Sequence, residues 1–195
     1  MKHRNRSVVV LFVLLLAFSA CKTEYEKTIQ NELASGVQYD SLFLGLEFGQ
    51  TRKEFFDLCW ELNKSIGLQP SGKGTMLGHI LTTRGTDNAK IKMKFYPTFN
   101  KEDKINGMDL EFSYMGWSPW AEQYQADKLL PAVIDTFENW YGRNTFSKLS
   151  FEKDPKEIWV KVDGNRRLAI FQKDVEILEM KITNLLDERE DGEKK

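Results

Sequence analysis

Apolar and polar residues alternate along two stretches in the middle of the chain, residues 89–96 and 108–114. This period-two pattern predicts β-strands that bury one face and expose the other. Lysines fill most polar positions of the first stretch and acids most of those of the second. Antiparallel pairing of the two strands would therefore bring opposite charges together on the solvent-exposed face of the sheet. The pair Asn106-Gly107, just before the second stretch, predicts a turn.

Five further stretches have the β-branched and aromatic composition of strands. They are residues 76–83, 146–151, 158–162, 168–173 and 175–183. Asp163-Gly164 predicts a hairpin turn between two of them. Strands are thus expected in both halves of the chain.

Apolar residues at spacings of three and four predict a helix after residue 51. Thr51-Arg52-Lys53-Glu54 has the spacing of a capping box, and Gly67 is a typical helix stop. The buried stripe is expected to consist of Phe55, Leu58, Cys59, Leu62 and Ile66. Cys59 on this stripe is interpreted as a small buried hydrophobic residue and not as a reactive thiol.

A second helix is expected after Ser118-Pro119, because an N-cap residue followed by proline is typical of a helix start. Gly142 ends its apolar pattern. Pro131 lies inside the span, so a kink, or a break into two shorter helices, is expected near Leu130.

The expected elements repeat in order: a helix and three strands, then a helix and three or four strands. Either half alone would bury little core, so two halves that share a face are favoured. The expected fold class is α+β, with helices packed on antiparallel β-sheet and halves at residues 39–117 and 118–186.

Leu44–Glu54 resembles the approach to the first helix in two groups of proteins built from helix-plus-antiparallel-sheet repeats. These are the β-lactamase-inhibitor-like proteins and the small lipoprotein of the outer-membrane barrel-assembly machinery. The resemblance implies the same α+β repeat. The two-disulfide pattern of the inhibitor family is absent from this chain, which argues against carrying over its inhibitory role.

The N-terminus has the pattern of a secretory signal, in which basic residues precede the apolar run Val8–Phe18 and the small residues Ser19 and Ala20. The run is shorter than the roughly 20 residues of a spanning helix. Leu16–Cys21 resembles the lipobox of bacterial lipoproteins, although Phe18 replaces the usual leucine. The resemblance implies cleavage before Cys21 and acylation of its thiol. A spanning anchor and an ordinary cleaved signal are the alternatives.

The expected organisation follows from these segments. It is a signal peptide over 1–20, a lipidated cysteine and polar tether over 21–38, an α+β domain over 39–186 and a charged tail over 187–195. Fully extended, the tether would reach roughly 50 Å. A short helix over residues 24–34 is the alternative and would shorten that reach.

Charge and cysteine content narrow the class of protein. Removing residues 1–20 takes three of the 28 Lys and Arg and none of the 29 Asp and Glu, which leaves a net charge of −4 and argues against a nucleic-acid partner. With Cys21 lipidated, Cys59 is the one remaining thiol, so no intramolecular disulfide is expected.

The side chains of the mature chain give no pattern typical of an active site. His79 is its single histidine, so neither a histidine-dependent nucleophile nor a zinc site is expected, and no catalytic residue, metal or cofactor is assigned. Carboxylate pairs such as Asp109 with Glu111, or Asp87 with Glu102, match a solvated surface as well as a glycan hydrolase.

Aromatic residues are the better indication of recognition. Trp117 and Trp159 fall outside the apolar phases of their segments and are expected to be exposed. The expected function is a non-catalytic binding or assembly module of the cell envelope, with the lipid bilayer and an envelope protein as partners. A carboxylate-dependent glycan hydrolase and an inhibitor or immunity-like protein of an envelope enzyme are the alternatives. Lys22 after Cys21 favours the outer over the inner membrane, with the face left open.

Overall fold

The computed structural model describes residues 23–71, 76–81, 89–151 and 154–188. The predicted signal peptide, Cys21 and all but the first two residues of the predicted charged tail lie outside the described residues. Within the described part of the chain, no helix is long and apolar enough to cross a bilayer.

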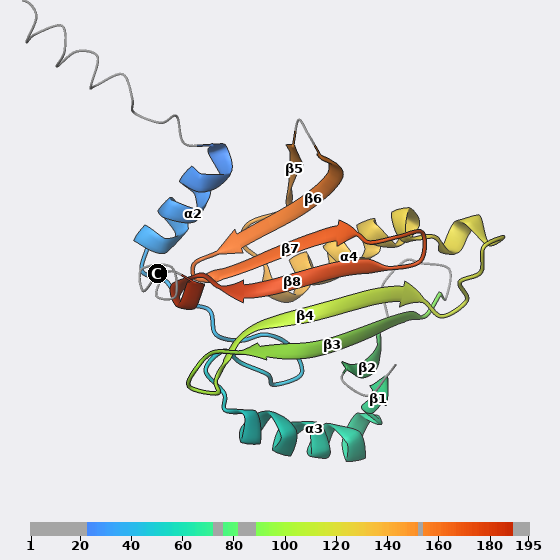
Figure 1. The fold of residues 1–195 in the computed structure, drawn as a ribbon, viewed down its shortest axis with the longest axis horizontal. Helices are drawn as coiled ribbons and strands as arrows, with labels where there is room; N and C mark the ends of the chain where they lie inside the picture. The colour runs from blue at the N-terminus through green and yellow to red at the C-terminus, as the bar shows by residue number, and fades with distance from the viewer. Residues whose placement is uncertain (1–22, 72–75, 82–88, 152–153, 189–195) are drawn as a thin grey trace, which may run out of the picture.

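Helices and an antiparallel sheet make up the described chain, which confirms the predicted α+β class (Figure 1). The helices are α2 (Glu24–Ala34), α3 (Arg52–Ile66) and α4 (Ala126–Tyr141), with the 3-10 helix η1 (Glu122–Tyr124) before α4. The strands are β1 (Gln69–Ser71), β2 (Met76–Leu81), β3 (Ile91–Phe99), β4 (Ile105–Tyr114), β5 (Ser147–Phe151), β6 (Asp154–Asp163), β7 (Arg166–Gln172) and β8 (Leu178–Asn184).

The eight strands form one sheet in the order β1-β2-β3-β4-β8-β7-β6-β5. Each half of the chain thus contributes a helix followed by a four-stranded meander, and the last strands of the two meanders pair in the middle. Leu110 of β4 lies opposite Met180 of β8 in this central pairing. The short edge strand β1 was not among the predicted strands.

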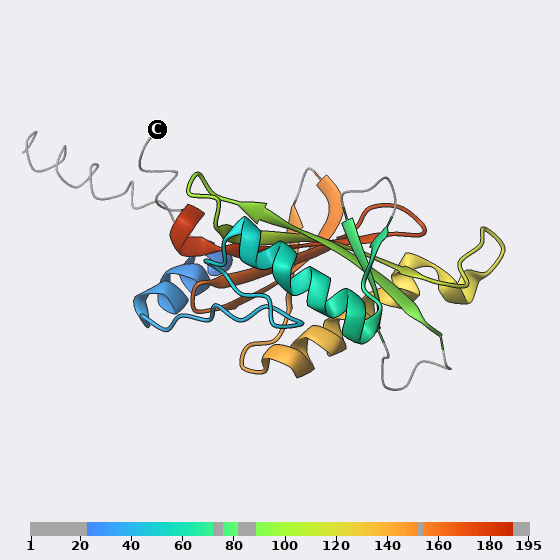
Figure 2. The ribbon, with the colours of Figure 1, turned by 90° about the horizontal axis from the view of Figure 1, so that it is seen from below.

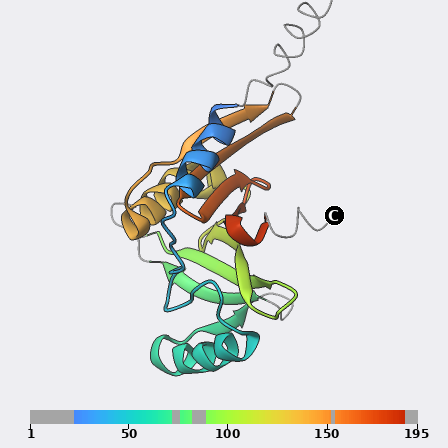
Figure 3. The ribbon, with the colours of Figure 1, turned by 90° about the vertical axis from the view of Figure 1, so that its left-hand side faces the viewer.

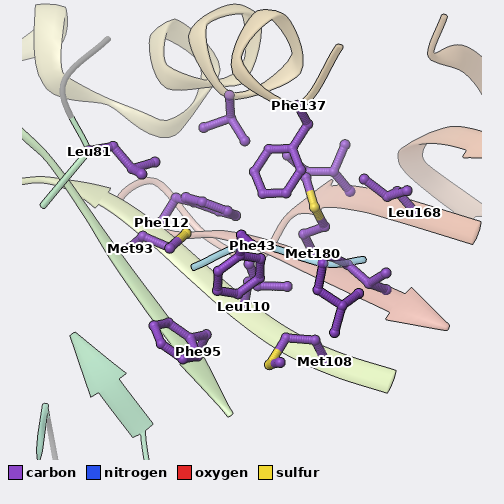
Figure 4. Packing of buried hydrophobic residues seen from close by; sticks show 14 of the residues in the cluster. Phe43, Leu81, Met93, Phe95, Met108, Leu110, Phe112, Phe137, Leu168 and Met180 are labelled. Atoms are coloured by element: carbon purple, nitrogen blue, oxygen red, sulfur yellow. The ribbon is translucent and has the colours of Figure 1, made fainter. Parts of the chain in front are cut away.

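The predicted alternation in β3 and β4 is confirmed. Met93, Phe95, Leu110 and Phe112 point to one side of the sheet and are fully buried, in the cluster that Figure 4 shows. This side is called the α4 face, because α4 crosses it (Figure 2). On the opposite side, called the open face, Lys94 Nζ lies 3.2 Å from Glu111 Oε2.

The predicted turn at Asn106-Gly107 is wrong, because both residues belong to β4. The chain turns earlier, where Asn100 Oδ1 accepts the backbone N–H groups of Glu102 and Lys104 (both 3.0 Å). A Cβ at Gly107 would lie 2.8 Å from the carbonyl oxygen of Ile182, so glycine lets β8 approach closely here.

Helix α3 begins and ends as predicted. The Thr51 side chain accepts the N–H of Glu54, the Glu54 side chain accepts the N–H of Thr51, and Gly67 closes the helix in the left-handed conformation. Phe55 packs edge-on against Tyr96 and Phe99, with ring centres 6.1 and 6.2 Å away. Helix α3 therefore flanks the sheet at β3.

The predicted start and break of the second helix are wrong. Residues 118–121 form a turn, η1 follows, and α4 runs without a break from Ala126 to Tyr141. Starting at Ala126 places Pro131 in the second turn of α4, so the missing N–H removes only the bond to the carbonyl of Asp127. Burial of Leu129, Val133 and Phe137 offsets that loss.

The segment between α2 and α3 fills the space between the two halves. Leu44 and Gly45 both have positive φ (55° and 79°), and the N–H of Leu46 donates to the carbonyl of Phe43 (2.9 Å). This tight turn places Phe43 against Phe95 and Trp140, with ring centres 5.0 and 6.2 Å away. One loop thus contacts both halves of the core.

Two buried charges join the end of α4 to the sheet. Lys161 and Asp163 of β6 are both fully buried, with Lys161 Nζ 2.6 Å from Asp163 Oδ2. Lys161 Nζ also donates to the carbonyl oxygens of Gly142 (2.7 Å) and Asn144. Because these groups satisfy the ammonium, the strand can bury a lysine beneath the helix terminus.

Candidate recognition surface

The prediction that Trp117 and Trp159 are exposed is wrong. Both side chains are partly buried against the hydrophobic core, and both indole nitrogens are buried without a hydrogen-bond partner among the described residues. Trp159 lies opposite Ile170 in register, so it points to the α4 face with the core residues. Sequence phase alone did not show which face α4 would cover.

The most exposed large apolar side chain in the described part of the chain is Trp120, at 88% of its full exposure. It lies in the loop between β4 and α4, which projects from the end of the molecule in Figures 1 and 2. The N–H of Ala121 donates to the carbonyl of Ser118 (3.0 Å), and the N–H of Trp117 donates to the carbonyl of Tyr114 (3.3 Å). Trp117 thus holds the base of the loop while Trp120 faces solvent.

The loop between β7 and β8 lies beside this projecting loop. The N–H of Ala126 donates to the carbonyl of Val175 (2.9 Å), which ties the start of α4 to it. Asp174 Oδ1 accepts the N–H groups of Glu176 and Ile177 (both 2.8 Å), so the loop is ordered by its own contacts. We call the exposed residues Met115, Trp120 and Val175 the loop patch.

Trp159 does contribute to a surface feature, although not as an exposed side chain. It lines a groove of about 500 Å³ that also includes Leu130, Glu157 and Val175. The groove therefore runs from strand β6 to the loop patch.

A second exposed aromatic group lies on the outer side of α3. Phe56 and Trp60 are 52% and 65% exposed, and Lys64 Nζ lies 5.5 Å from the Trp60 ring centre. We call Phe56 and Trp60 the α3 face. Their four-residue spacing, one position after each of the buried residues Phe55 and Cys59, is visible in the sequence and could have identified them.

The open face of the sheet carries a pair of neighbouring carboxylates, which bears on the hydrolase alternative. Glu111 and Glu179 lie opposite each other in register, and Lys173 Nζ bridges them at 3.0 and 2.6 Å. Burial alone would raise the pKa of Glu111, but hydrogen bonds from Lys173 and Lys94 outweigh it and hold that pKa below its usual range. Glu111 is therefore ionised at neutral pH and is a poor general acid.

The remaining sequence candidates, His79 and Cys59, lie in environments that disfavour their charged forms. Burial lowers the pKa of His79 and raises that of Cys59 to about 11, so the thiol is protonated at neutral pH. Among the described residues, no group of three or more His, Cys, Asp and Glu could hold a metal ion. Asp87, paired with Glu102 in the sequence interpretation, lies outside the described residues.

No protein-family model, no curated protein and no solved structure matches this chain.

Proposed function

We propose that this protein is a lipid-anchored component of the bacterial cell envelope whose folded body binds a protein partner without catalysing a reaction. The lipobox-like Leu16–Cys21 supports the anchor, and Lys22 favours the outer membrane. The loop patch supports the binding role.

The observation that carries the proposal is the exposure of Trp120 on an ordered loop. A tryptophan can bury a large area on association, and this residue type is enriched among the positions that dominate binding energy. Because turn hydrogen bonds hold the loop on both sides of Trp120, binding would cost little ordering entropy. An isolated solvent-facing indole has no comparable role in folding.

A second candidate function uses the same geometry. A projecting loop with an apolar tip fits the entrance of an enzyme, so an inhibitor or immunity-like role against an envelope enzyme is the alternative. The two functions differ in whether the captured partner loses catalytic activity on binding.

The test begins with the intact mass of the purified protein. A mature chain that begins at Cys21 and carries acyl mass supports the anchor, whereas an unmodified chain in the soluble fraction contradicts it.

The partner is sought by cross-linking in envelopes, with Trp120→Ala and the matched variant Trp60→Ala compared with the wild type. We expect the major cross-linked protein to fall at least tenfold with Trp120→Ala and to persist with Trp60→Ala. Equal yields from all three proteins would contradict a role for the loop patch. Loss with Trp60→Ala alone would assign binding to the α3 face.

A further inference from the structure

Helix α2 begins almost at the proposed lipid anchor. Its N-cap is Thr23, whose side chain accepts the N–H of Glu26 (3.2 Å) while Glu26 accepts the N–H of Thr23 (2.8 Å). Only Lys22 separates this cap from Cys21. The path from Cys21 to the first turn of α2 is therefore about 10 Å at most.

The other end of α2 is fixed to the body, in contrast to the predicted polar tether. The Glu32 carboxylate accepts the backbone N–H of Gly164 and the side-chain N–H of Asn144, both at 2.8 Å. Gly164 lies at the turn between β6 and β7, and Asn144 follows α4. The helical alternative for residues 24–34 is thus confirmed, and this helix is docked.

The chain after α2 continues the attachment around the same hairpin. We call residues 37–41 the strap. The N–H of Tyr39 donates to Asn165 Oδ1 (2.5 Å), and Arg166 Nη1 donates to the carbonyl of Ser41 (2.6 Å). Arg143 donates to the Tyr39 hydroxyl. These contacts fix the chain directly after α2, so the helix leaves the body from a fixed point, and the Glu32 contacts hold it there.

Helix α2 and helix α3 lie at opposite ends of the strand order. Helix α2 contacts β6, next to the edge strand β5, whereas α3 flanks β3 in the other half. Figures 1 and 3 both show the first turn of α2 on the β5 side and α3 at the far end of the sheet.

We infer that the body is held against the bilayer in one orientation, with the β5–β6 edge toward the lipid and α3 pointing away. This inference rests on the proposed lipid anchoring. Helix α2 is about 16 Å long, so its docked end lies within about 26 Å of the anchored residue. The α3 face would then point into the aqueous compartment.

The inference is tested with the full acylated protein in phosphatidylcholine vesicles that contain headgroup-spin-labelled lipid. A fluorophore is attached at Lys148→Cys on β5 or at Lys64→Cys on α3, each in a Cys59→Ala background. Both lysines are exposed and make one surface ion pair each, which matches the two sites. We expect at least threefold stronger quenching at position 148 than at position 64.

The docking of α2 is tested with Glu32→Ala and the matched control Glu24→Ala in the same helix. Glu24 is exposed, and its one ion pair within the described residues is with Lys27 of α2 itself, at 3.7 Å. Glu32→Ala should reduce the quenching difference at least twofold, and Glu24→Ala should preserve it. An unchanged difference in Glu32→Ala would contradict a docked α2 that sets the orientation.

The outcomes separate the two proposals. Equal or reversed quenching in an acylated, vesicle-bound protein overturns the orientation and leaves lipid anchoring intact. A protein without acyl mass that does not sediment with vesicles overturns the anchoring, and the orientation with it.

Discussion

At the scale of one residue, Gly164 allows the segment before α3 to pack closely against the turn between β6 and β7. Its φ of +55° favours glycine, and a Cβ there would lie 2.2 Å from the carbonyl oxygen of Val37. The same residue donates its N–H to Glu32. A side chain at this position would therefore force the strap away from the β6–β7 turn.

The substitution Gly164→Ala should lower the free energy of unfolding by more than backbone strain alone. The matched control is Gly49→Ala, because Gly49 also has positive φ (+82°) but no atom within 4 Å of the position that an added methyl group would take. The control should cost only the strain of the left-handed conformation, about 1–2 kcal/mol. Urea unfolding measures both variants. Equal losses of unfolding free energy in the two variants would show that the strap can move away from residue 164 without a cost in stability.

At the scale of the element, the docking of helix α2 depends on the carboxylate of Glu32, because none of the residues of α2 is fully buried. Burial alone would raise the pKa of Glu32, but the hydrogen bonds from Gly164 and Asn144 outweigh it and hold that pKa below its ordinary value of 4.5. A depressed native pKa adds stability above the unfolded pKa, and this contribution is lost as pH falls through the native pKa.

The variant Glu32→Gln should therefore be less stable than the wild type at pH 7, by about 1–2 kcal/mol after allowance for solvent screening. The difference should shrink as the pH falls below about 4.5, where the unfolded chain binds a proton at Glu32, and should be lost once the native carboxylate is protonated as well. Urea unfolding at pH 7, 4 and 3 measures it. Glu24→Gln is the control and should differ little from the wild type. A constant Glu32→Gln deficit across this range would show that ionisation is not its cause.

At the scale of the molecule, the two halves share one sheet and one hydrophobic core. They pair through β4 and β8, and Phe112 of the first half packs against Phe137 of the second, with ring centres 5.8 Å apart. Phe43 contacts Trp140 across the same boundary. Separating the halves would expose one long unpaired strand edge and part of the core in each.

Residues 39–117 and 118–186, expressed as separate fragments, should each fail to unfold cooperatively, while the mature chain gives a single transition. Circular dichroism during thermal unfolding measures this. The mixture of both fragments is the control, because reassociation would restore the β4–β8 pairing. A cooperative transition in either fragment alone would show that the half is an independent domain.

Several features of the fold could be predicted from the sequence because short-range interactions determine them. The capping box at Thr51 and Glu54 acts within one turn, and the alternation along β3 needs only one buried and one wet face. The order of elements then gave the α+β class and the two helix-plus-strand halves.

The recognition surface and the docking of α2 were decided by tertiary structure. Trp159 is partly buried because α4 crosses its face of the sheet, and Trp120 is exposed because no element of the described chain covers its loop. Glu32 accepts a hydrogen bond from Gly164, which lies 132 positions away in the sequence. Sequence by itself determined most of the strands and helix α3, since those patterns are local, but not the start of α4 or the edge strand β1. Only the fold decided which side chains remain exposed, because burial depends on distant segments that pack against them.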